Sequence, residues 1–154
     1  MTMFELSAVT KLYRMSPKDP GFRALDGVDL RIEDGEFSAV VGPSGGGKST
    51  LLHMMGALDR PTQGSCRVGG RETASLSDAE LSGLRREKIG FVFQAFHLLS
   101  RLPALDNVAL PMVYAQVPRA ERRARAQRLL EQVGLGGKGR QTPLELSAGE
   151  RQRV

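Results

Sequence analysis

Hydrophobic and polar positions alternate over two stretches near the start of the chain. The first covers Phe4–Leu12 and the second Ala24–Ile32, with the loop-forming segment Ser16–Gly21 between them. A period of two is typical of strands with one buried face, and clustered Ser, Pro, Asp and Gly indicate a loop. The pattern therefore predicts two strands at the N-terminus. A shorter strand is predicted at Ser65–Val68, followed by a Gly69-Gly70 turn.

Two further stretches are apolar at nearly every position. These are Phe37–Val41 and Ile89–Phe93. Short continuous apolar runs favour strands that are buried on both faces, as in a parallel sheet. We therefore expect both to lie in a core sheet.

Four segments between and after the predicted strands have apolar residues at the spacing of a helix. The predicted helices cover Ser49–Leu58, Ser77 to about Lys88, Asp106–Tyr114 and Arg119–Val133. The second begins with Ser77 and carries Glu80 three residues later, which is the pattern of a capping box.

The chemistry is concentrated between the Phe37–Val41 strand and the first helix. Gly42-Pro43-Ser44-Gly45-Gly46-Gly47-Lys48-Ser49-Thr50 fits the phosphate-binding (Walker A) pattern G-x-x-x-x-G-K-[ST]. Glycines allow successive backbone N–H groups to converge on one anion, and the helix N-terminus adds partial positive charge. The motif predicts an ATP site with Mg²⁺, in which Lys48 neutralises phosphate charge and Ser49 offers a hydroxyl to the metal. The predicted nucleotide-binding residues here are Gly42, Ser44, Gly45, Gly47, Lys48, Ser49 and Thr50.

The composition of the chain narrows the class of protein and is compatible with an ATP site. The 154 residues carry a net charge of +5 and one cysteine, Cys66, which excludes an internal disulfide and is expected to be buried. No apolar run is long enough to span a membrane, and the first ten residues do not resemble a signal peptide. Basic residues are densest over Arg119–Arg128, but no aromatic residues alternate with them. We therefore expect a solvated helix face there and no nucleic-acid partner.

Two further motifs identify a family. Leu146-Ser147-Ala148-Gly149-Glu150 and the following Arg151–Val154 resemble the signature L-S-G-G-Q of ABC transporter ATP-binding subunits. Ile89–Gln94, followed by Phe96-His97-Leu98-Leu99, resembles the Q-loop of the same family. The flanking residues are most similar to the lipoprotein-releasing and macrolide-export type, with the cell-division ATPase as a near neighbour.

The resemblance implies roles for residues outside the phosphate loop. Tyr13 matches the aromatic position that stacks on adenine, with Phe22 as its rival. Gln94 would contact Mg²⁺ or the attacking water, so that Gln94 and Lys48 are the implied catalytic residues. Ser147 and Gly149 would bind the γ-phosphate of a nucleotide held by a second subunit.

The sequence also departs from the family pattern. Ala148 and Glu150 replace the usual glycine and glutamine of the signature, so we expect weakened γ-phosphate contact. No apolar run ends in Asp-Glu, the pair that in this family supports Mg²⁺ and polarises water. The chain resembles an N-terminal part of the family's domain that ends just after the signature. We therefore expect an ATPase by resemblance whose 154 residues are inactive alone.

The resemblance implies an α/β fold of the ABC P-loop type. It would contain an N-terminal antiparallel β subdomain, a partial parallel core sheet and a helical subdomain, with the C-terminal part of the fold missing. We expect one incomplete domain, with the β subdomain and P-loop core at 1–93 and the Q-loop, helical subdomain and signature at 94–154. The implied partners are a membrane permease and a second copy, at the cytoplasmic face of the cell membrane.

Other functions stay open at this point. They are a nucleotide-binding module without turnover, the cell-division type of ABC ATPase, and a non-transport ABC ATPase acting on DNA or ribosomes. A small-molecule P-loop kinase is disfavoured by the signature.

Overall fold

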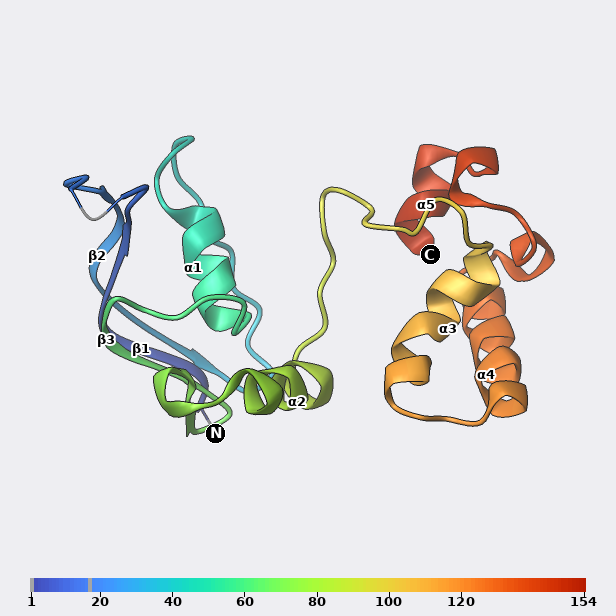
Figure 1. Ribbon diagram of the computed structural model, residues 1–154, viewed down its shortest axis with the longest axis horizontal. Coiled ribbons are helices and arrows are strands. Elements are labelled where there is room, and N and C mark those ends of the chain that lie inside the picture. Colours follow the sequence, from blue (N-terminus) through green and yellow to red (C-terminus); the bar gives the residue numbers. More distant parts are fainter. Residues whose placement is uncertain (1, 17) are drawn as a thin grey trace. The chain divides into compact units, whose positions relative to one another are not determined.

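The computed structural model describes residues 2–16 and 18–154. The chain forms two compact units, Met1–Phe91 and Val92–Val154 (Figure 1). The loop predicted at Ser16–Gly21 includes Pro17, which lies outside the described residues.

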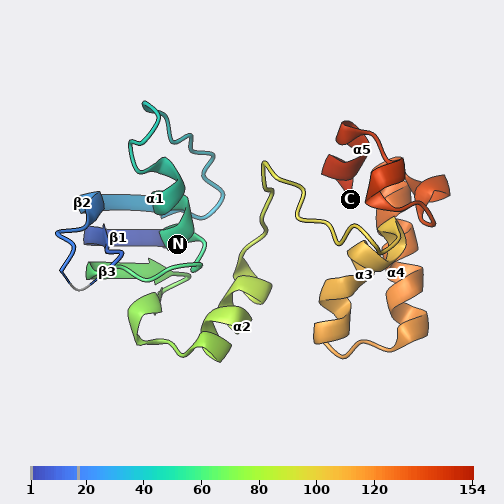
Figure 2. The same ribbon diagram turned by 45° about the horizontal axis from the view of Figure 1, so that its top comes forward.

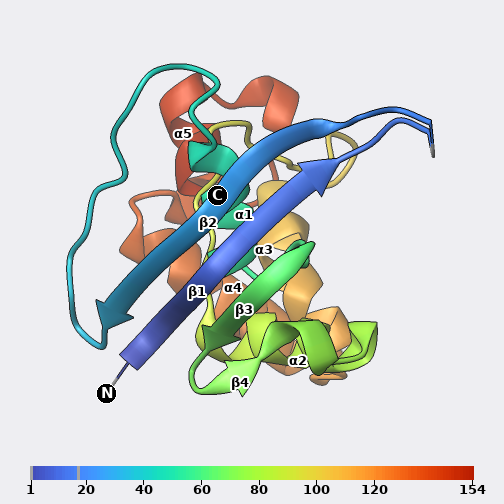
Figure 3. The same cartoon turned by 90° about the vertical axis from the view of Figure 1, so that its left-hand side faces the viewer.

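The first unit is built on a four-stranded antiparallel sheet with the order β2-β1-β3-β4. Its strands are β1 (Thr2–Tyr13), β2 (Phe22–Glu33), β3 (Gln63–Val68) and β4 (Arg71–Glu72). Figure 3 shows the three longer strands side by side, with β1 in the middle. The strands predicted from alternation are confirmed, each extended by a few residues.

Helix α1 (Lys48–Met55) packs on one face of this sheet (Figures 2 and 3). Met54 and Met55 of the helix join Leu6, Leu25 and other residues of the sheet in one apolar cluster. Cys66 is fully buried in the same cluster, as predicted. Burial of these side chains is the main force that fixes α1, and with it the phosphate loop, against the sheet.

Helix α2 (Asp78–Lys88) begins with the capping box predicted at Ser77. It follows a 3₁₀ turn at Thr73–Ser75. Its Leu81 and Leu84 pack in a second cluster with Val68 of β3.

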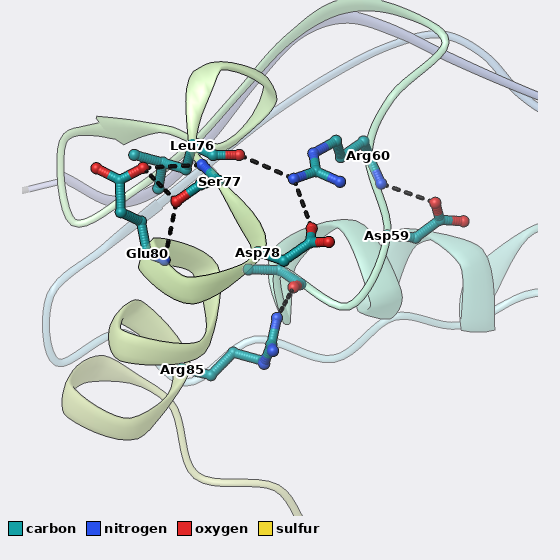
Figure 4. A network of polar contacts seen from close by, with 8 residues as sticks. Asp59, Arg60, Leu76, Ser77, Asp78, Glu80 and Arg85 are labelled. Atoms are coloured by element: carbon teal, nitrogen blue, oxygen red, sulfur yellow. Dashed lines mark hydrogen bonds and ion pairs between the residues drawn. The ribbon is translucent and has the colours of Figure 1, made fainter.

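Polar contacts connect α2 to the chain that follows α1 (Figure 4). Arg85 donates to the carbonyl oxygen of Ala57 at 2.6 Å, and Arg60 donates to the Leu76 carbonyl at 2.8 Å and to Asp78 at 2.9 Å. These bonds hold the segment after α1, which includes Asp59, in a defined position.

The second unit is helical. It contains α3 (Ala104–Tyr114), α4 (Arg119–Gln132) and α5 (Ala148–Arg153), with 3₁₀ turns at Gly136–Lys138 and Pro143–Glu145. Ala104, Leu130, Leu135 and Leu146 form its core. The two longer helices predicted from spacing are confirmed.

The predicted parallel core sheet is wrong for this structure. Phe37–Val41 and Ile89–Phe93 are not strands, and the only sheet among the described residues is antiparallel. Phe37 is 97% exposed and Val92 is 89% exposed. A strand is defined by hydrogen bonds to a neighbouring strand, and the sheet found among the described residues is formed by β1, β2, β3 and β4. Both segments are therefore apolar, as in a buried strand, although neither forms a strand in this structure.

Candidate functional site

The phosphate loop connects the extended Phe37–Val41 segment to α1. Gly45 and Gly47 have φ angles of +80° and +79°, in the left-handed region that glycine adopts most easily. The chain turns over residues 43–46, where Gly46 N donates a hydrogen bond to Pro43 O at 3.2 Å. Ser44 and Gly45 are exposed at the outer end of the loop.

Gly47 has a second reason to be glycine. It is the N-cap of α1, and a Cβ atom there would lie 2.4 Å from the carbonyl oxygen of Ala24 in β2. The junction between loop and helix therefore rests directly on the sheet backbone. This close approach fixes where the helix N-terminus lies.

Lys48 folds back over the loop. Its ammonium group donates to the carbonyl oxygens of Gly42 at 3.0 Å and Pro43 at 2.6 Å. The charge is therefore held at the loop, beside the helix N-terminus whose first amides have no partner inside the helix. The first turn of α1 contains no acidic residue, so no carboxylate opposes an anion there.

Ser49 and Thr50 complete the first turn of α1. Ser49 is exposed, as a metal-contacting hydroxyl would need to be, and Thr50 is half-buried. A triphosphate with a hard cation needs N–H donors, a cationic side chain and a hydroxyl oxygen. The loop and helix supply all of these, so the residues present fit Mg²⁺·ATP.

Tyr13 lies in the same unit as the loop. Its hydroxyl donates to Asp59 Oδ2 at 2.9 Å, and the residue is 40% exposed. Burial and the Asp59 carboxylate raise the pKa of the Tyr13 phenol, against an opposing interaction with Thr50. Phe22, the rival for the stacking role, is the cross-strand partner of Tyr13 and is 62% exposed.

Gln94 belongs to the second unit, where it is exposed. The segment around it contacts α5, because Gln152 donates to the carbonyl oxygen of Phe93 at 3.2 Å. The Arg151 guanidinium also lies 5.0 Å from the centre of the Phe96 ring. The structure therefore brings the Q-loop segment and the signature helix together.

Ser147 is the N-cap of α5. Its hydroxyl oxygen accepts from Glu150 N at 3.3 Å, and the Glu150 carboxylate accepts from Ser147 N at 2.8 Å. The O–H of Ser147 in turn interacts with the Glu150 carboxylate, because this hydroxyl helps to lower the pKa of Glu150. Binding of an anion by the Ser147 hydroxyl would therefore require its O–H to turn away from Glu150.

The two departures from the family signature have local structural explanations. Ala148 is the first helical residue of α5, a conformation that alanine adopts without strain. The Glu150 carboxylate pairs with Lys138 at 2.9 Å, so its negative charge is compensated. Gly149 is exposed in the first turn beside them.

The Glu150 environment makes a pH-dependent prediction. The Lys138 ammonium first, and then the Ser147 N–H and hydroxyl, lower the pKa of Glu150 from 4.5 to about 2. A depressed carboxyl pKa means that this stabilisation is fully present above pH 4.5 and is lost as the pH falls toward 2. We expect Lys138→Met to raise the pKa of Glu150, measured by carboxyl-carbon NMR.

Glu145 is a matched control for this measurement. It caps its own turn through the Thr142 N–H and hydroxyl, which lower its pKa without a lysine. Lys138→Met should leave the Glu145 titration unchanged. An unchanged Glu150 titration in that variant would contradict the assigned role of Lys138.

Sequence patterns did not identify Lys11, Asp59 or Lys138. Their contacts join residues 12 to 48 positions apart in the chain, and no local motif encodes such pairs. Lys11 is placed two residues before Tyr13 on the same strand, which is the one signal that could have drawn attention to it.

The glycine loop, Lys48 and the helix N-terminus define a P-loop protein. The ABC transporter family model matches residues 25–154, and the chain belongs to the ABC transporter family. This confirms the resemblance found in the P-loop, the Q-loop and the signature.

Individual relatives agree with this assignment. The chain is 49% identical to an uncharacterised ABC transporter ATP-binding protein of Thermotoga maritima, covering 99% of the chain and 64% of that protein. It is 46% identical to the macrolide export ATP-binding/permease protein MacB of Sodalis glossinidius, covering 99% of the chain and 23% of that protein. The chain thus spans less than two thirds of the length of these relatives.

The fold agrees as well. A dimeric post-hydrolysis structure of the ATP-binding cassette MJ0796, bound to ADP and phosphate, matches with a TM-score of 0.86 and 42% identity. The match covers 98% of this chain and 66% of that one. Within the described residues, no helix is both long enough and apolar enough to cross a bilayer.

Proposed function

We propose that this chain binds Mg²⁺·ATP in its phosphate loop and serves as the ATP-binding part of an ABC exporter. The observation that carries the proposal is the loop itself: left-handed glycines, a helix N-terminus without a side-chain cap and the Lys48 ammonium lie at one place. Lys48 would neutralise β- and γ-phosphate charge, and Ser49 would contact the metal ion. Bound Mg²⁺ would supply charge neutralisation at the phosphates.

The other predicted residues would have the roles that the family resemblance implies. Tyr13 would stack on adenine, and Gln94 would contact the metal ion or a water molecule. Ser147 and Gly149 would contact the γ-phosphate of a nucleotide in a second copy. The dimeric state named for the MJ0796 structure supports this pairing.

A membrane permease is the proposed partner. Relatives that match the chain are named as export ATP-binding/permease proteins, for macrolides in one case and syringafactin in another. We propose export of the macrolide or lipoprotein-releasing type, with the chain peripheral on the cytoplasmic face of the cell membrane. Residues 1–93 would provide the P-loop core, and residues 94–154 the Q-loop and signature.

We further propose that the 154 residues bind ATP without turning it over. They contain no apolar run that ends in Asp-Glu, the pair that in this family supports Mg²⁺ and polarises water. The test is phosphate release from Mg²⁺·ATP, compared between the wild-type chain and Lys48→Met. We expect equal, background rates. Sustained multiple-turnover release by the wild type that disappears in Lys48→Met would contradict the proposal.

A further inference from the structure

Two charged residues that are paired with each other, Lys11 and Asp59, both contact Tyr13. Lys11 lies on β1, two residues before Tyr13, so both side chains point to the same face of the strand. Asp59 follows α1. One Asp59 carboxylate accepts from both residues, from Lys11 Nζ at 2.6 Å and from the Tyr13 hydroxyl at 2.9 Å.

The backbone beside Asp59 fixes this arrangement further. Lys11 Nζ also donates to the carbonyl oxygen of Arg60 at 2.8 Å, and Arg60 N donates to Asp59 Oδ1 at 2.7 Å. The Lys11 side chain is only 12% exposed and that of Asp59 is 29% exposed. A charge pair that is largely removed from water and bonded in this way is much less mobile than a surface pair.

Lys11 also contacts the aromatic ring. Its ammonium nitrogen lies over one face of the Tyr13 ring, 5.0 Å from the ring centre. The ring is thus held at its hydroxyl by Asp59 and on one face by Lys11. A cation on one face of a ring leaves the other face for a flat ligand, and Tyr13 is 40% exposed.

We propose that Lys11 and Asp59 are positioning residues that hold the Tyr13 ring ready to stack on the base of the bound nucleotide. The inference rests on the proposed function, because it requires a nucleotide in the phosphate loop. A ring that is already fixed loses little conformational freedom when a base stacks on it, which increases affinity.

Lys11 and Asp59 should affect the binding of the base and not the binding of the phosphates. The contacts described for Lys11 and Asp59 are with each other, with Tyr13 and with Arg60, and none of these residues lies in the 42–50 loop. Inorganic tripolyphosphate, which has phosphates but no base, therefore separates the two effects.

The experiment is a calorimetric titration of the full chain with ATP and with tripolyphosphate, both with Mg²⁺. The variants are Lys11→Met and Asp59→Ala, and Lys18→Met serves as a control that removes one charge from an exposed loop residue. Since stacking on an aromatic side chain changes affinity by about 5- to 150-fold, we expect about a three- to tenfold loss of ATP affinity. Tripolyphosphate affinity should stay within about twofold of the wild type in every variant.

A second set of variants tests whether the pair acts through the ring. In a Tyr13→Ala background, Lys11→Met should cause no further loss of ATP affinity, because the ring that it positions is gone. A purely structural role for Lys11 would persist in that background. Asp59→Asn keeps an oxygen acceptor for the Tyr13 hydroxyl, so it should retain more ATP affinity than Asp59→Ala.

Several results would overturn the inference. Equal losses for ATP and tripolyphosphate would show that the pair only supports folding. Unchanged ATP affinity in both variants, or an undiminished effect of Lys11→Met in the Tyr13→Ala background, would show that it does not position the ring. Equal binding of ATP and tripolyphosphate by the wild type would overturn this inference alone, whereas failure of the wild type to bind either ligand would remove the proposed function with it.

Discussion

Replacing Lys48 with methionine is expected to lower the affinity of the chain for Mg²⁺·ATP by about 10- to 100-fold. Methionine keeps an unbranched side chain of similar length but removes the ammonium group. A hydrogen bond to a charged group contributes about 1.5–3 kcal/mol, and each 1.4 kcal/mol corresponds to about a tenfold change in affinity. Calorimetric titration with Mg²⁺·ATP measures the change directly.

The control for Lys48 must separate lost charge from lost loop structure. In the structure the ammonium group also donates to the Gly42 and Pro43 carbonyls, so Lys48→Met removes two bonds within the loop. Lys48→Arg keeps a positive charge, although its planar guanidinium has a different shape. We expect it to retain part of the ATP affinity. Equal affinities of Lys48→Arg and Lys48→Met would assign the effect to loop geometry and contradict the role given to the charge.

Gly47→Ala is the second substitution with a large expected effect. An alanine there would adopt a φ of +79°, and its Cβ would lie 2.4 Å from the carbonyl oxygen of Ala24. The backbone conformation alone costs about 1–2 kcal/mol, and the clash forces the helix N-terminus away from the sheet. We expect a free energy of unfolding lower by about 2–4 kcal/mol and no measurable ATP binding, tested by denaturant unfolding and titration.

Gly45 provides the matched control. Its φ of +80° is nearly the same, but a Cβ there would meet no atom within 4 Å. Gly45→Ala should therefore show only the conformational cost, about 1–2 kcal/mol, and keep the helix in place. If the two variants were equally destabilised, the contact between Gly47 and β2 would not be what fixes the helix N-terminus.

The parts of the fold that sequence predicted correctly are those in which local pattern and structure agree. Alternation over β1 and β2 and the cap at Ser77 depend on residues a few positions apart. These signals are local, so they do not depend on how the rest of the chain packs. The phosphate loop belongs to the same group, because its spacing is itself the motif.

The features that the sequence predicted wrongly or missed depend on tertiary structure. Phe37–Val41 has the composition of a buried strand, but a strand also needs a hydrogen-bonded neighbour, and composition does not report whether one is present. The Lys11–Asp59–Tyr13 contacts likewise depend on how α1 lies on the sheet. Tertiary packing decides both, so neither could be deduced from local spacing.

The proposed function requires above all that the 42–50 loop and Lys48 hold a triphosphate. Competition between ATP and inorganic tripolyphosphate for the wild-type chain, repeated with Lys48→Met, tests it most directly. We expect excess tripolyphosphate to displace ATP from the wild type, and Lys48→Met to bind both ligands weakly. ATP that stays bound with full affinity in excess tripolyphosphate, or that binds Lys48→Met as tightly as the wild type, would contradict the claim.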